Sequence, residues 1–193
     1  MSNLVIEALG AEPRTLAQLS PMLIEVVAGG GSVGFMHPLA SDAALSFLTQ
    51  SLSAAARGER VILGAWDEGT LAGTVTLLLA CPPNQPHRAE IAKLMTRVDR
   101  RGRGIAAALM RAAEALAIER GKTLLVLDTA SEGGARGLYQ GLGFTLAGEI
   151  PGYAFKPQGG LSGTLIYWKR IGGVAQLKEN LDSGPGTAML QSL

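Results

Sequence analysis

The sequence contains little that would support a disulfide-bonded, metal-binding or membrane-spanning protein. Its single cysteine, Cys81, excludes an internal disulfide and a cysteine-rich metal site. The two histidines, His37 and His87, have no partner at metal-ligand spacing. No apolar run approaches the roughly 20 residues of a membrane span, and the first residues lack the charged segment and apolar core of a signal peptide. We therefore expect a cytoplasmic protein without a bound metal.

Charge of one sign is also scarce, because the formal net charge is only +1 and 17% of the residues are charged. This balance gives no reason to expect a nucleic-acid or membrane-surface partner. A hydrophobic content of 47% is typical of a globular chain. Its 193 residues suit one domain over residues 1–171, followed by a tail over 172–193. We expect the tail to be mobile or to dock on a partner subunit, so a homodimer is left open.

Hydrophobic periodicity predicts strands and helices in a mixed order. The expected order is strand, two helices, three strands, helix, strand, helix and two strands. The strands are expected at 4–9, 60–66, 71–80, 90–98, 124–127, 145–153 and 161–171, and the helices at 15–28, 42–56, 105–120 and 131–142. The unit from Glu90 to Asp128 reads strand, helix, strand, which predicts a right-handed crossover between parallel neighbours. The rest of the sheet is predicted to be antiparallel, so the fold class is mixed α/β.

The segment Arg101-Gly102-Arg103-Gly104-Ile105-Ala106 joins an expected strand to an expected helix. The first amides of a helix lack intrahelical partners and favour an anion, so this turn is a candidate pyrophosphate site. A Walker loop is excluded because the lysine and the hydroxyl residue are missing. A dinucleotide fingerprint is excluded because Ala107 replaces its third glycine. The remaining alternative is an arginine-rich surface turn.

The pattern Arg101-x-x-Gly104-x-Ala106 resembles motif A of the GNAT acetyltransferase superfamily, and the order of elements is similar. The resemblance implies acetyl-CoA as cofactor and a mostly antiparallel sheet whose parallel pair, near 90–98 and 123–128, is splayed open. It implies that the cofactor binds to the glycine-rich loop, the strand before it and the tyrosine considered next: Met95, Thr96, Arg97, Val98, Arg101, Gly102, Arg103, Gly104, Ile105, Ala106 and Tyr139. Period-two counting places Thr96 and Val98 on the strand face of Glu90, unless a bulge intervenes.

Acyl transfer to an amine requires a proton donor for the departing thiolate. Tyr139, a few residues before Gly143-Phe144, resembles the second motif of the superfamily, which implies a general acid close to the coenzyme A sulfur. A phenol donates across the working pH range without tuning. The alternative is a core aromatic residue with a satisfied hydroxyl. Several glycines near it favour either a close ligand approach within a helix over 131–142 or a loop with a short helical turn.

Two acids, Glu90 and Asp128, are candidates for the base that deprotonates the acceptor ammonium. Parallel strands end on the same side, so Asp128 is expected near the acyl group, with Glu90 further back along its strand. The alternatives are an Asx turn or helix cap for Asp128 and an ordinary strand-end carboxylate for Glu90. Many superfamily members carry asparagine near position 128, so the acid is a departure.

Several segments are similar to the tabtoxin-resistance acetyltransferases within this superfamily. They include Gly30–Met36, Arg88–Glu90, Lys93–Met95, Leu127–Thr129 and Gly148–Tyr153. This resemblance favours Glu90 and Asp128 as bases, and it implies an acceptor site formed by Phe35, Met36, Glu90, Asp128 and Tyr153. Simple packing is the alternative for Phe35 and Met36.

We therefore predict an acetyl-CoA-dependent N-acetyltransferase that acts on a small-molecule primary amine, such as an amino-acid-like metabolite or a toxin. Transfer is expected to be direct, in a ternary complex, because no cysteine lies in a site-like motif. Two alternatives remain open. One is an acetyltransferase of protein or peptide N-termini, and the other is a non-catalytic acyl-CoA-binding module.

Overall fold

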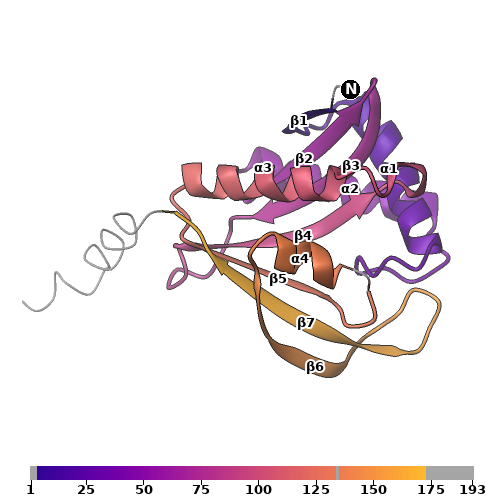
Figure 1. Cartoon of the computed structure of the whole chain (residues 1–193). Coiled ribbons are helices and arrows are strands. Elements are labelled where there is room, and N and C mark those ends of the chain that lie inside the picture. Colours follow the sequence, from indigo (N-terminus) through magenta and orange to yellow (C-terminus); the bar gives the residue numbers. More distant parts are fainter. Residues whose placement is uncertain (1–3, 134, 173–193) are drawn as a thin grey trace, which may run out of the picture.

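Seven strands lie side by side in the order β1-β2-β3-β4-β5-β7-β6, with helices on both faces (Figure 1). The computed structural model describes residues 4–133 and 135–172. The strands are β1 (Leu4–Ala8), β2 (Arg60–Asp67), β3 (Thr70–Leu78), β4 (Arg88–Thr96), β5 (Leu124–Ala130), β6 (Thr145–Phe155) and β7 (Leu161–Arg170). The helices are α1 (Pro13–Ala28), α2 (Ser41–Ala56), α3 (Ile105–Glu119) and α4 (Arg136–Gly141), with a 3-10 turn, η1, at Val98–Arg100. Only β4 and β5 pair in parallel, which confirms the predicted mixed sheet.

Two apolar clusters divide the core between the faces of the sheet. One packs α3 and α4 on the sheet and includes Leu109 and Tyr139. The other packs α1 and α2 on the opposite face and includes Leu23 and Leu48. Because successive side chains of a strand point to opposite faces, each strand residue belongs to one face. We call these the α3 face and the α1 face.

The parallel pair is joined over only part of its length. The ladder begins at Arg88 and Leu124 and ends at Ile91 and Leu127. Beyond these residues β4 continues along β3, while β5 continues along β7. Residues 92–96 of β4 and 128–130 of β5 therefore face each other without pairing. We call this divergence the splay.

A bulge in β4 changes which face its side chains reach. Thr76 of β3 pairs with Ala92, whereas Thr74 pairs with Met95, so two residues of β4 lie opposite one of β3. Lys93, the first of the two, has a positive φ of 50°. Before the bulge Ile91 belongs to the α3 face, and after it Met95 belongs to the α1 face. An odd-numbered residue thus changes face, so the predicted grouping of Thr96 with Glu90 is wrong.

Three predicted elements differ from the structure near their ends. The strand expected to reach Val98 ends at Thr96, and Val98 begins η1. β5 extends to Ala130, so Asp128 lies within the strand and not after it. The helix expected over 131–142 is shorter and covers Arg136–Gly141. Glycines that stabilise a helix poorly precede and interrupt that segment, which explains the short turn.

The predicted tail lies outside the described residues, apart from Gly172. No helix in the described part of the chain combines the length and the apolar character needed to cross a membrane.

Candidate functional site

The glycine-rich loop leaves open space in front of the first amides of α3. Gly102 and Gly104 have φ values of 74° and 77°, a region that other residues rarely adopt. Gly104 is the N-cap and brings no side chain to the helix, whose first backbone bond runs from the Ala108 N–H to the Gly104 carbonyl at 3.0 Å. The N–H groups of residues 105–107 precede that bond. A Cβ atom on either glycine would meet nothing within 4 Å, so the loop can accept an anion.

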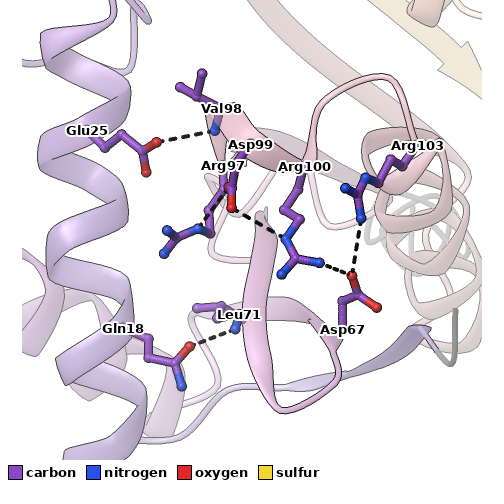
Figure 2. Close-up of polar contacts among 9 residues, drawn as sticks. All are labelled: Gln18, Glu25, Asp67, Leu71, Arg97, Val98, Asp99, Arg100 and Arg103. Carbon is purple, nitrogen blue, oxygen red and sulfur yellow. Dashed lines mark hydrogen bonds and ion pairs between the residues drawn. The ribbon is translucent and has the colours of Figure 1, made fainter.

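Two arginines of the loop are held by one buried carboxylate (Figure 2). Asp67, at the end of β2, has a side chain only 4% exposed. Arg100 donates to its Oδ2, and Arg103 Nη1 lies 3.8 Å from the same oxygen. The Arg103 side chain is 55% exposed, against 23% for Arg100. Arg100 therefore fixes the loop to β2, whereas Arg103 keeps a solvent-facing guanidinium.

The other two arginines of this region face solvent to different degrees. Arg97 Nε donates to Asp99 Oδ1 at 3.2 Å, in an exposed pair. Arg101 is exposed, and its side chain forms no ion pair or hydrogen bond with the described residues. Of the predicted phosphate-binding arginines, Arg101 is thus the one whose charge is entirely available to a ligand.

Two side chains of helix α1 accept hydrogen bonds from backbone amides, one in η1 just before the loop and one in β3 (Figure 2). Glu25 Oε1 accepts the Val98 N–H at 3.4 Å, and Gln18 Oε1 accepts the Leu71 N–H at 2.7 Å. The first contact engages the amide of a residue that was predicted to bind the pantetheine arm. Val98 therefore has a protein partner for its N–H.

The strand edge predicted to bind pantetheine lies along the splay. Arg97 donates its N–H to the Ala72 carbonyl of β3 at 3.0 Å. Backbone groups alternate sides along a strand, so Thr96 turns its N–H and carbonyl toward the splay. The Met95 side chain is buried among α1 and α2 residues. By the same alternation its backbone groups turn toward β3, where Met95 lies opposite Thr74, so of these two residues Thr96 is the one that offers its backbone to a ligand.

Tyr139 reaches the splay from the α3 face. The side chain lies on α4, its ring centroid is 5.5 Å from that of Tyr167, and it is only 6% exposed. Burial raises the pKa of its phenol, the hydrogen bond with the Thr129 side chain opposes this, and the charge of Asp128 raises it further. The phenol therefore stays protonated at neutral pH and can act as a proton donor.

The two candidate acids project from the α1 face. Glu90 pairs with Val126 in the last part of the parallel ladder, and its Oε2 lies 3.5 Å from Arg88 Nη1. Asp128 is the first residue of β5 beyond the ladder and is exposed. Its Oδ2 accepts a hydrogen bond from Thr164 Oγ1 at 3.1 Å. The structure thus places Asp128 at the mouth of the splay and Glu90 one step behind it.

The loop between α1 and α2 carries the predicted acceptor residues Phe35 and Met36. Phe35 is partly buried and packs edge-to-face on Phe47 of α2, with ring centroids 4.9 Å apart. Met36 is 49% exposed. Phe35 therefore serves packing in addition to any contact with an acceptor, in line with the alternative considered for it.

The β6–β7 hairpin closes one side of this region by contacting the same loop. The His37 N–H donates to the Pro157 carbonyl at 2.8 Å, and Gln158 Nε2 donates to the Ala28 carbonyl at 2.9 Å. Tyr153 lies on β6 and is 56% exposed. Its side chain has no hydrogen bond or ring contact with any other residue that the structure describes.

Two cations near the acids were not identified as site residues from the sequence. Lys93, at the bulge, places its Nζ 5.8 Å from the Phe47 ring centroid. Burial lowers the pKa of its ammonium, Asp128 opposes this, Arg60 lowers the pKa further and Glu90 raises it. A lysine inside the apolar run Ile91–Met95 was the available signal. Arg60 begins β2 and therefore resembled an ordinary solvated strand end.

The acetyltransferase (GNAT) family model matches residues 35–144, more than half of the chain. A ribosomal-protein-alanine N-acetyltransferase from Brucella melitensis is 21% identical, with a TM-score of 0.75 over 86% of this chain and 99% of that one. A putative acetyltransferase, yncA, from Salmonella typhimurium, solved with its cofactor acetyl-CoA, is 17% identical, with a TM-score of 0.74 over 89% and 96%.

A putative phosphinothricin N-acetyltransferase is 19% identical, with a TM-score of 0.70 over 89% of this chain and 100% of that one. At these identities the structural likeness shows the fold alone. The family match adds to it, because it contains β4, the glycine-rich loop, α3, β5 and Tyr139. The chain therefore belongs to the acetyltransferase (GNAT) family and is an acetyl-CoA-dependent N-acetyltransferase.

Proposed function

We propose that this enzyme acetylates the primary amine of a small molecule, with its site at the splay between β4 and β5. The observation that carries the proposal is the convergence there of Tyr139 from one face of the sheet and Asp128 from the other. The open N-terminal amides of α3 follow β4 in the chain, after η1 and the glycine-rich loop.

The residues around the splay fit coenzyme A. The open space at Gly102 and Gly104 suits a pyrophosphate, and Arg101 supplies a free guanidinium beside it. Thr96 offers backbone groups to an amide-containing arm. When bound, acetyl-CoA supplies an acetyl group activated as a thioester, which an acceptor amine attacks directly.

The acids receive the proton of the acceptor. A lysine-like amine is protonated at neutral pH, because its pKa is about 10.4. Asp128 carries this role more directly, since it is exposed at the mouth and keeps one carboxylate oxygen clear of the Thr164 hydroxyl. Glu90, held near Arg88, adds negative charge that attracts an ammonium. Tyr139 holds its proton at Oη for the departing sulfur.

The closed side of the acceptor region favours a small acceptor over a polypeptide. The loop between the first two helices is hydrogen-bonded to the β6–β7 hairpin at His37 and Ala28. A peptide chain would need a groove open at both ends. The short segments that resemble the tabtoxin-resistance acetyltransferases support this class, and the putative phosphinothricin N-acetyltransferase among the structural neighbours is compatible with it.

We also propose that a second copy of the chain covers the outer strand β6. All of its residues are exposed, and large apolar side chains gather there and at the start of β7: Leu146, Ile150, Tyr153, Phe155 and Leu161. An exposed edge strand offers unpaired backbone groups to an identical edge. Light scattering after size exclusion tests this, because a monomer at every concentration contradicts it and Ile150→Lys should weaken the dimer.

Thiol release from acetyl-CoA, measured against amines, amino acids, aminoglycosides and N-terminal peptides, tests the proposed activity. Release with small amines and not with peptides is the expected result. Release only with peptides would establish the polypeptide alternative. A chain that binds acetyl-CoA without releasing thiol to any acceptor would be a binding module.

A further inference from the structure

A small cavity on the α1 face lies next to the candidate site and is not used by the chemistry described above. Its volume is about 130 Å³, and it lies between α2 and strands β2, β3 and β4. A cavity of roughly this size holds one small chemical group. Its lining includes Phe47, Arg60, Thr74 and Lys93.

Two polar groups in this lining are buried without a hydrogen-bond partner. Arg60 donates from Nη1 to Ser51 Oγ at 3.2 Å, but its buried Nε–H has no acceptor. The buried Thr74 hydroxyl likewise has none. An unpaired buried donor costs about 1–3 kcal/mol, so such groups require an explanation. A ligand that accepts hydrogen bonds in the cavity would satisfy both.

The charged residues that line the cavity, Arg60 and Lys93, are both cations. The Lys93 ammonium forms no hydrogen bond or ion pair in the described part of the chain, and it lies over the Phe35 and Phe47 rings at 6.0 and 5.8 Å. Arg60 forms no ion pair there either. Two cations and a hydroxyl without an anion among them are suited to bind an acidic group.

The charges are arranged in order across the sheet. Arg60, Leu78, Glu90 and Val126 are paired in one row across β2, β3, β4 and β5. Neighbouring strands are about 4.8 Å apart, so Arg60 and Glu90 begin about 10 Å from each other. Lys93 lies near three charged groups. In addition to the lowering by burial, Asp128 raises the pKa of Lys93, Arg60 lowers it and Glu90 raises it. Negative charge therefore lies at β5 and β4, and positive charge at β4 and β2.

We infer that the acceptor is an amine that also carries a carboxylate, which binds in this cavity to Arg60, Lys93 and Thr74 while the amine faces Asp128. The inference rests on the proposed function, because it concerns the acceptor of that reaction. The unused Nε of Arg60 belongs to a guanidinium edge that can bind a carboxylate. An acceptor of this kind is an amino acid or a closely similar zwitterion, and a simple alkylamine would leave the cavity unfilled.

Matched pairs of amino acids and their amides test this inference by turnover. We expect kcat/KM to be at least about tenfold higher for the acid than for the amide, since a charge-assisted hydrogen bond contributes about 1.5–3 kcal/mol. Arg60→Gln should lower kcat/KM for acids about 10–100-fold through KM and lower it for amides much less, and Arg60→Lys should recover part of the loss. Arg57→Gln is the control, because Arg57 is exposed and pairs with Glu59. Equal turnover of acids and amides by the wild type overturns the inference.

Ligand-induced thermal stabilisation with coenzyme A present gives a readout that does not need turnover. Acids should raise Tm more than amides, and Arg60→Gln should abolish the difference. If acids stabilise the protein but no amine is acetylated, the cavity assignment stands and the proposed activity fails. If amines are acetylated without preference for acids, the activity stands and the cavity assignment fails. A phosphonate analogue that binds more tightly than the carboxylate would contradict the choice of anion.

Discussion

Tyr139 and Asp128 lie on opposite faces of the sheet at the same segment of β5, to which Asp128 belongs. Tyr139 hydrogen-bonds with Thr129, and the charge of Asp128 contributes to its raised pKa. Asp128 and Thr129 are consecutive residues of β5 and therefore project to opposite faces of the sheet. Tyr139 contacts Thr129, so it lies on the face opposite to Asp128. The proposed proton donor and the proposed proton acceptor are thereby kept apart within the protein.

Removing the phenol hydroxyl should impair turnover and leave cofactor binding intact. We expect Tyr139→Phe to lower kcat about 100-fold, the low end of general acid catalysis, with acetyl-CoA affinity nearly unchanged. Tyr167→Phe is a matched control, because that neighbouring hydroxyl is buried without a partner and its removal should be neutral or stabilising. Steady-state kinetics and calorimetric titration measure both. Unchanged turnover in Tyr139→Phe would remove it as the acid.

A side chain at Gly104 should block the cofactor. Gly104→Val would project into the open space in front of α3, so acetyl-CoA binding should be lost. Gly58→Val separates this effect from backbone strain, because Gly58 has the same φ of 77° and also has nothing within 4 Å of a Cβ atom. Both variants should lose similar stability, about 1–2 kcal/mol, while only Gly58→Val binds the cofactor. Equal affinity in the two variants would contradict the loop assignment.

The carboxylate that anchors the loop should matter for stability. Asp67→Ala leaves the mostly buried guanidinium of Arg100 without this partner, and breaking a buried pair costs about 3 kcal/mol. Urea unfolding should show this loss of stability. Steady-state kinetics should show a raised KM for acetyl-CoA, because the loop is released. Asp99→Ala, whose side chain is 58% exposed, should change stability by less than about 1 kcal/mol. Similar losses in both variants would mean that Asp67 has no special role.

The largely buried ammonium of Lys93 should lower the free energy of unfolding at neutral pH. Burial lowers its pKa below 10.5 in the folded state, so between the two pKa values the unfolded chain binds more protons. Its contribution to stability therefore rises with pH through that window. Lys93→Met should be more stable than wild type near pH 7, with the gap narrowing toward pH 10.5. Lys156→Met, which breaks an exposed pair with Glu132, should not be stabilised. A wild type more stable than Lys93→Met at pH 7 would contradict this.

Loss of both acids should alter the pH dependence of the reaction. The double variant Glu90→Gln, Asp128→Asn should lose the rise of kcat/KM that accompanies deprotonation of the base. Of the single variants, Asp128→Asn should have the larger effect, since Asp128 lies at the mouth of the splay. Glu119→Gln, at the exposed end of α3, is the control. A profile that does not change in the double variant would mean that water or another group takes the proton.

The sequence predicted the sheet, its parallel pair and the glycine-rich loop because these depend on local patterns. Alternating and periodic apolar residues fix strands and helices, and the positive φ of Gly102 and Gly104 suits glycine. The bulge at Lys93 could not be predicted in this way, because it depends on how β4 pairs with β3. Of the two alternatives for residues 131–142, the loop with a short helical turn is the one that the structure shows, because the glycines there stabilise a longer helix poorly.

The candidate site was predicted in part for a related reason. Tyr139 and Asp128 belong to short motifs, so the sequence could single them out. Arg60 and Thr74 come from different strands and meet only through the antiparallel pairing of β2 with β3. No motif contains both, and their shared feature, a buried donor without an acceptor, is visible only in three dimensions.

The bulge in β4 changes the parity with which side chains alternate between the two faces of the sheet. Up to Ala92 the even-numbered residues face α1, and from Met95 onward the odd-numbered ones do. Straightening the bulge with every residue kept would turn Met95, and the residues up to the glycine-rich loop, toward the opposite helix layer. Deleting Lys93 would instead leave Ala92 opposite Thr76 and Met95 opposite Thr74 in a regular ladder, so the cofactor side would keep its register while the acceptor side lost a cation.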